Sequence, residues 1–229
     1  MLPRIGLDLA FIKNMSEQQL KKIVYILVSI AITLILQACG RDLDPQESCN
    51  FVQNAKLQRV SWKGKMVKLY IHDSVPKEYI GEIKAAAKIW NEEATKLNKE
   101  ERVLISIESV VGGPLNPQRD GYNIVYLMSD WEENKLTEQA RTTIYWTGNR
   151  IYEADVRINK RHKFSAQDTG VDGNKIDMRS LMVHEFGHIL GLSHVEPEKE
   201  SVMHAHLAGG KERREISTYD KKSLKCEYM

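Results

Sequence analysis

The chain has 229 residues, of which 42% are hydrophobic and 28% are charged. This length and composition are typical of one well-packed domain with a short additional segment. The 33 Lys and Arg residues nearly balance the 31 Asp and Glu residues, and no basic patch is interleaved with aromatic side chains, so the charge gives no support for nucleic-acid binding.

The first apolar segment is typical of an export signal. Lys21 and Lys22 precede an apolar run over residues 23–36, which is short for a membrane span but usual for a signal peptide. Residues 36–39 read LQAC and resemble a bacterial lipobox, in which the chain is cut before the cysteine and the cysteine is acylated. We therefore expect a signal peptide over 1–38 and a lipid on Cys39, with an uncleaved membrane anchor as the alternative.

Three further expectations follow from this segment. A start at Met15 instead of Met1 would give the signal an ordinary length. Gly40 stands where an aspartate favours inner-membrane retention in some Gram-negative bacteria, so we expect an exported protein held at the outer membrane or cell surface. Residues 39–60 are polar and patternless, and are predicted to be the lipidated cysteine and a tether.

The remaining cysteines are Cys49 and Cys226. In an oxidising compartment two such residues can form a disulfide, here between the tether and the last helix, and two free thiols are an equally open alternative.

Residues 61–229 are predicted to form one α+β domain. Runs rich in alternating or β-branched residues predict strands over 66–76, 102–110 and 122–128, and a hairpin over 141–159 around Gly148-Asn149. Helical spacing of apolar residues predicts an amphipathic helix over 76–97. Asp177 and Ser217 are placed as N-caps of two more helices, which gives about five strands, two of them in an antiparallel hairpin, and three helices.

The second of these helices contains the sequence LMVHEFGHILGLSH, residues 181–194. His184 and His188 are four residues apart, so they project from the same helical face and can bind one zinc ion. Glu185 lies at the rim of that face, where it can reach a metal-bound water. His194 would lie about 15 Å along the axis from His184 if the helix continued. The chain must therefore turn at Gly191, because glycine accepts the positive φ that ends helices.

Three histidine ligands leave a fourth position for water, which indicates a catalytic zinc site rather than a structural one. The spacing HExxHxxGxxH is the metzincin signature. Met203, nine residues after His194, matches the Met-turn of that family, and this short gap resembles the matrixin branch. Ala205 stands where the related astacins have a tyrosine that contacts zinc.

The resemblance implies a metzincin-like fold in which Met203 lies beneath the three imidazoles. It also implies that residues 141–147 form the edge strand above the cleft, to which a peptide would add by β-augmentation. The remaining histidines, at positions 72, 162, 204 and 206, match no ligand position and are expected on the surface. Residues 168–175 hint at calcium, but Arg179 stands where an EF-hand needs glutamate, so a plain loop is favoured.

We expect a zinc-dependent endopeptidase in which zinc activates a water and Glu185 is the general base. Its substrate would be a protein or peptide, and the chain is expected to be a monomer held on a bacterial membrane by lipid. Two alternatives remain. One is a catalytically inactive zinc-binding surface lipoprotein that acts as an adhesin or binding module. The other is an amidase acting on cell-wall peptides, which would use a different ligand pattern.

Overall fold

The computed structural model describes residues 17–19, 21–22, 25, 49–196 and 198–229, and the chain divides into two compact units, residues 1–44 and 45–229. Met15 and Cys39 lie outside the described residues, as does most of the expected signal peptide. Within the described residues, no helix is long and apolar enough to cross a bilayer.

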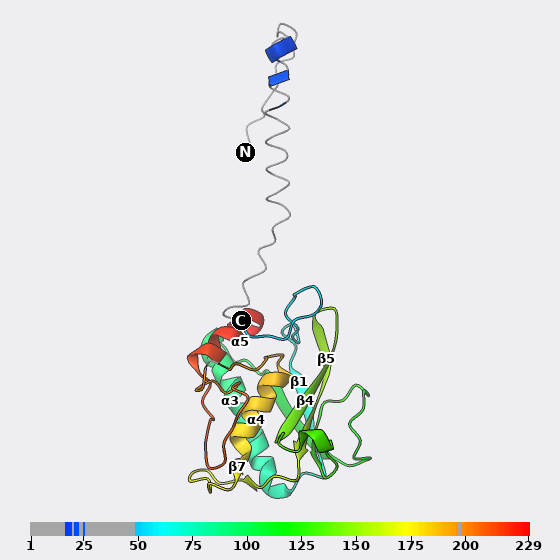
Figure 1. The fold of residues 1–229 in the computed structure, drawn as a ribbon, viewed down its shortest axis with the longest axis vertical. Coiled ribbons are helices and arrows are strands. Elements are labelled where there is room, and N and C mark those ends of the chain that lie inside the picture. Colours follow the sequence, from blue (N-terminus) through cyan, green and yellow to red (C-terminus); the bar gives the residue numbers. More distant parts are fainter. Residues whose placement is uncertain (1–16, 20, 23–24, 26–48, 197) are drawn as a thin grey trace. The chain divides into compact units, whose positions relative to one another are not determined.

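The second unit contains a twisted five-stranded sheet and three helices (Figure 1). The strands of the sheet are β1 (Val67–His72), β2 (Ile105–Val111), β3 (Ile124–Met128), β4 (Ala140–Thr147) and β5 (Arg150–Asn159). The helices are α3 (Lys77–Asn98), α4 (Met178–Ile189) and α5 (Thr218–Tyr228). A 3₁₀ turn, η2 (Glu133–Lys135), and a short parallel pair, β6 (Phe164–Ser165) with β7 (Ile176–Asp177), complete the set.

The sheet has the order β2-β1-β3-β5-β4. All neighbours are parallel except β4 and β5, which form an antiparallel hairpin that places β4 at the edge. The hairpin turns at Gly148-Asn149, and Gly148 has a φ of +61°, which glycine adopts at little cost. The predicted α+β fold, with a mixed sheet, an antiparallel edge hairpin and three helices, is confirmed.

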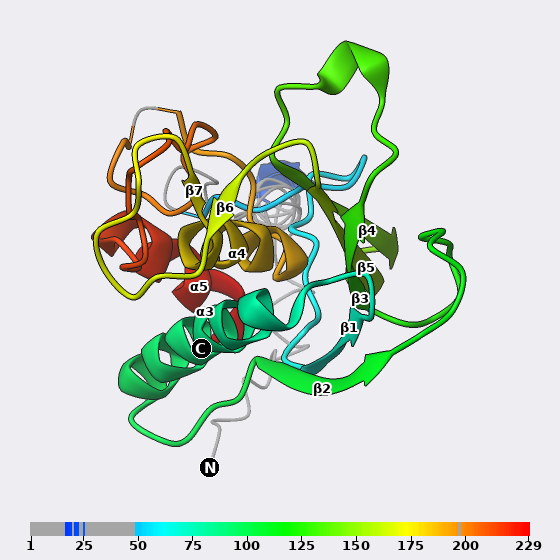
Figure 2. The same cartoon turned by 90° about the horizontal axis from the view of Figure 1, so that it is seen from below.

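Helices α3 and α4 pack side by side against one face of the sheet (Figure 2). Their contact is centred on Trp90, whose side chain is fully buried and whose indole Nε1 donates a hydrogen bond to the Val183 carbonyl at 2.9 Å. On α4 the side chains of Met182 and Phe186 point into the same core. Replacing the Trp90 side chain by a methyl group would cost about 3–5 kcal/mol of stability.

The expected boundary at residue 61 is placed too late. Phe51 and Val60 are buried, and residues 51 and 61 form β-bridges to Leu192 and Arg150. The folded unit therefore includes residues 49–60, and only residues before 49 remain as the expected tether. The prediction that residues 49–60 belong to a tether was wrong, because isolated apolar residues in a polar stretch give no periodic pattern. The β-bridge partners of residues 51 and 61 lie at positions 192 and 150, far along the chain.

The structure joins Cys49 to Cys226 in a disulfide, with a Cα–Cα separation of 6.0 Å. This is one of the two alternatives that the sequence left open for these cysteines. It attaches the first residue of the folded unit to α5, whose N-terminus is a capping box formed by Ser217 and Asp220.

Candidate zinc site and substrate cleft

Helix α4 carries His184, Glu185 and His188. It begins after Asp177, whose carboxylate accepts a hydrogen bond from the Ser180 amide at 2.9 Å, as expected for an N-cap. Arg214 binds the same carboxylate, and its guanidinium and the Ser180 hydrogen bonds hold the pKa of Asp177 below its usual value although burial acts against this. The helix is thus fixed at its start by a charged group that stays ionised.

Helix α4 ends in a Schellman motif at Gly191. The Gly191 amide donates to the His188 carbonyl at 2.9 Å, and the Leu192 amide donates to the Gly187 carbonyl at 3.0 Å. Gly191 has a φ of +99°, and a Cβ at this position would collide with the main-chain oxygen of Val60. The glycine expected as the hinge is therefore required both by its backbone conformation and by the close approach of the N-terminal segment.

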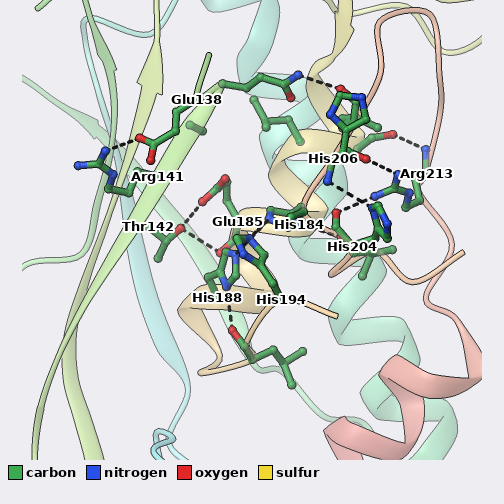
Figure 3. A pocket seen from close by; sticks show the side chains of 18 of the residues that line it. Glu138, Arg141, Thr142, His184, Glu185, His188, His194, His204, His206 and Arg213 are labelled. Carbon is green, nitrogen blue, oxygen red and sulfur yellow. Dashed lines mark hydrogen bonds and ion pairs between the residues drawn. The ribbon is translucent and has the colours of Figure 1, made fainter. Parts of the chain in front are cut away.

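The turn brings His194 back to the two helical histidines (Figure 3). The Nε2 atoms of His184 and His188 are 3.0 Å apart, those of His188 and His194 are 3.0 Å apart, and those of His184 and His194 are 3.2 Å apart. Nitrogens bound tetrahedrally at about 2.0–2.1 Å from zinc lie about 3.3 Å from one another. Within the described part of the chain, these three residues form the only cluster of His, Cys, Asp or Glu that could hold a metal ion.

The other ring nitrogens fix the tautomers of the two helical ligands. His184 Nδ1 lies 2.7 Å from the Val202 carbonyl, and His188 Nδ1 lies 2.8 Å from the Leu192 carbonyl. Because a carbonyl only accepts, each Nδ1 carries the proton and each Nε2 presents its lone pair to the shared centre. Burial holds the pKa of His184 well below its usual value and lowers the pKa of His188 to about 4, so both rings are neutral, as metal binding requires.

Glu185 is buried at the rim of this centre, with a relative exposure of 3%. The Thr142 hydroxyl, on β4, donates a hydrogen bond to its Oε2 at 2.5 Å. Burial raises the pKa of Glu185 to about 7, although the hydrogen bond from Thr142 acts in the opposite direction. A carboxyl group with a pKa near neutrality can both take up and release a proton at physiological pH. Thr142 carries no pattern in the sequence, and only the structure reveals its role.

Met203 packs against the underside of α4 at Gly187. A Cβ at Gly187 would overlap the sulfur of Met203 and lie 3.2 Å from Cζ2 of Trp90, so only glycine leaves room for the methionine. Asp220, at the start of α5, holds this turn: it accepts hydrogen bonds from the Ser201 hydroxyl at 2.5 Å and from the Val202 amide at 3.0 Å. Met203, which the sequence predicted to lie in a Met-turn, thus packs beneath α4, and Gly187 and Asp220 are additional residues that hold this turn.

A cavity of about 470 Å³ runs across the histidine cluster. Strand β4 forms one wall, α4 forms the floor, and the opposite wall comes from residues 204–207 and Arg213. Arg213 donates hydrogen bonds to the main-chain oxygens of His204 at 2.9 Å and His206 at 2.6 Å (Figure 3). Among the described strands β4 pairs with β5 alone, so its other edge is available to an extended peptide lying along the cleft.

Of the histidines expected on the surface, His72 is buried, with a relative exposure of 4%, and His204 and His206 line the cleft. In the loop considered for calcium, the Asp168 carboxylate is bound to Arg179 at 2.5 Å.

A mixed sheet with an antiparallel edge strand, a helix carrying HExxH, a third histidine after a glycine turn and a methionine beneath the helix together define a metzincin domain. The chain belongs to the matrixin family, whose family model matches residues 50–229.

Among solved structures, the chain is similar to metalloproteinase-II from Bacteroides fragilis, with a TM-score of 0.44 and 12% sequence identity. The match covers 82% of this chain and 59% of that one, so this chain spans less than two thirds of its length. No curated protein matches the chain.

Proposed function

We propose that this chain is a zinc-dependent endopeptidase that hydrolyses peptide bonds with Glu185 as general base. The single observation that carries the proposal is the convergence of three Nε2 atoms beside a buried carboxyl group, in a cleft bordered by a free strand edge. Membership of the matrixin family supports the same activity. The substrate is a protein or peptide in extended conformation.

His184, His188 and His194 would hold the zinc ion. When bound, zinc supplies Lewis-acid chemistry, which makes water a stronger acid and a peptide carbonyl a better electrophile. The main chain of β4 would pair with the substrate backbone and so fix the scissile bond over the histidine cluster. Pairing through the main chain binds many sequences, which leaves side-chain preference to the cavity walls.

Glu185 would move the proton. Its carboxylate takes the proton of the attacking water and then donates it to the amine that leaves when the C–N bond breaks. Thr142 keeps Oε2 pointed toward the cleft during both transfers, since its hydroxyl approaches that oxygen from β4.

The test is cleavage of an unstructured protein such as casein by the purified chain and by Glu185→Gln. We expect the variant to keep one zinc per chain and to lose about 10²–10⁴-fold in kcat. Glu92→Gln, on the exposed side of α3, is the control and should retain full activity. Zinc binding by the wild-type chain without cleavage of any protein would overturn the proposal and favour the inactive binding lipoprotein. Cleavage of isolated peptidoglycan peptides alone would favour the amidase.

The proposal includes export and a lipid on Cys39, supported by the sequence of residues 21–39. Metabolic labelling with a radioactive fatty acid should label the wild-type protein in the outer-membrane fraction. Cys39→Ala should remain unlabelled. Equal labelling of both would exclude Cys39 as the site.

A further inference from the structure

The first residues of the folded unit run antiparallel to the segment that delivers the third histidine. The Val52 amide donates to the Gly191 carbonyl at 2.8 Å, and the Ser193 amide donates to the Asn50 carbonyl at 3.0 Å. Phe51 and Leu192 form a β-bridge between these two bonds. The segment 191–194 has left helix α4, so residues 50–52 supply the main-chain partners that the helix no longer offers.

The Asn50 side chain reaches further along the same segment. Its Nδ2 donates to the Ser193 carbonyl at 2.5 Å and lies 3.3 Å from the His194 carbonyl. The amide group therefore binds the main chain on both sides of the His194 Cα atom. The position of the imidazole depends on that main chain, because His194 has no helix to orient it.

The same strand pair also affects His188. The Leu192 carbonyl, which accepts the Nδ1 proton of His188, belongs to the residue that faces Phe51. Two of the three histidines therefore depend on the geometry of residues 191–194, one through a hydrogen bond and one through the chain itself.

Asn50 is in turn fixed to α5. Its own amide donates to the Ser223 hydroxyl at 3.1 Å, and the preceding residue is Cys49, bonded to Cys226 of the same helix. The first residues of a domain fray unless they are tied down. The disulfide provides this attachment one residue before Asn50.

We propose that Asn50, held in place by the Cys49–Cys226 disulfide, is a positioning residue for His194 and sets the zinc affinity of the site. The proposal rests on the zinc site of the proposed function. Hydrogen-bonding partners of metal ligands typically contribute about 10–100-fold to metal affinity. We expect an effect of this size from the Asn50 side chain, which binds the main chain on both sides of His194.

The experiment measures the zinc dissociation constant of the purified chain by competition with a chromogenic chelator. Asn50→Ala and Asn50→Asp both remove the amide donor, and we expect each to weaken zinc binding about 10-fold or more. Asn54→Ala is the matched control, because its side chain binds Gln58 and Gly148 and not residues 191–194. Its affinity should equal that of the wild type.

The double substitution Cys49→Ser with Cys226→Ser should weaken zinc binding at least as much as Asn50→Ala, with faster zinc release. When cobalt replaces zinc, the visible spectrum of the double variant and of Asn50→Ala should differ from that of the wild type, since His194 is displaced in each. If the double variant does not fold, Asn50→Asp still tests the proposal, because it keeps the disulfide and the size of the side chain.

Unchanged zinc affinity in folded Asn50→Ala and Asn50→Asp would overturn the inference and leave the peptidase proposal standing. If the wild-type chain binds zinc but cleaves no protein, and the Asn50 variants lose zinc affinity, the peptidase proposal is overturned and the inference about Asn50 stands.

Discussion

The two parts of the histidine cluster are held in different ways. His184 and His188 lie on one helix, and their spacing alone places their rings on the same face. His194 lies in an irregular segment that is shaped by residues 50–60, more than 130 positions earlier in the chain. The arrangement of His184 and His188 therefore follows from the local sequence, whereas the position of His194 depends on the assembled fold.

The largest effect is expected at Gly191, in the turn that connects the two helical histidines to His194. Gly191→Ala forces a side chain into a positive-φ conformation and against the Val60 carbonyl, so we expect a loss of about 2–4 kcal/mol of stability, together with weaker zinc binding. Urea unfolding with and without zinc measures both.

Gly121→Ala separates the two causes. Gly121 has a φ of +87° and nothing within 4 Å of its added Cβ, so this change should cost only about 1 kcal/mol. Equal losses in the two variants would show that the approach of residue 60 does not constrain the turn.

A smaller effect is expected in helix α4, which carries His184 and His188. Gly187→Ala improves helix propensity but displaces Met203, and we expect a net loss of about 1–3 kcal/mol. Gly81→Ala, in α3 with open space around its Cβ, should instead stabilise the chain by about 0.5–1 kcal/mol. Thermal unfolding of both variants should therefore give shifts of opposite sign. A gain at Gly187 would mean that the Met-turn is not tightly packed against α4.

Thr142 tests the contact between the sheet and the helix. Thr142→Val removes the hydroxyl that binds Glu185 and keeps the shape, so kcat should fall about 10-fold while KM and zinc content stay the same. Thr142→Ser keeps the hydroxyl and should restore most of the activity. A serine variant as slow as the valine variant would assign the effect to packing.

The smallest effect is expected at Asp155, on the face of the sheet away from the cleft, and concerns the pH dependence of stability. Burial raises the pKa of Asp155 to about 7 from 3.8, with the charges of Glu153 and Asp120 adding to the effect. The folded chain therefore keeps this proton at a pH where the unfolded chain releases it. Stability contributed by this group is complete below pH 3.8 and is lost as the pH rises through about 7.

Asp155→Asn should flatten this part of the stability curve, measured by urea unfolding between pH 4 and 8. At any given pH, the zinc affinity of Asp155→Asn should equal that of the wild type, because the Asp155 side chain does not line the cleft. A steep curve in the variant would assign the pH dependence to other groups.

The sequence predicted what is periodic or short in range. The strands, the helices, the caps at Asp177 and Ser217 and the histidine spacing all follow from local patterns, and the fold they imply is the one observed. Met203 and the edge strand came from resemblance to the family. The role of residues 49–60, the hydrogen bond from Thr142 and the support from Asp220 could not be predicted, since each joins residues that only the fold brings together.

The disulfide has a topological consequence. It links residues 49 and 226, which are 177 positions apart and lie at the two ends of the folded unit, so nearly the whole unit is a covalently closed loop. Proteases cut folded chains mostly in solvent-exposed loops, and residues 112–116 form such a loop here. A single cut would open this loop without releasing a fragment, and the two pieces would stay at a high effective concentration. The disulfide would thereby keep the two pieces of a cut chain together.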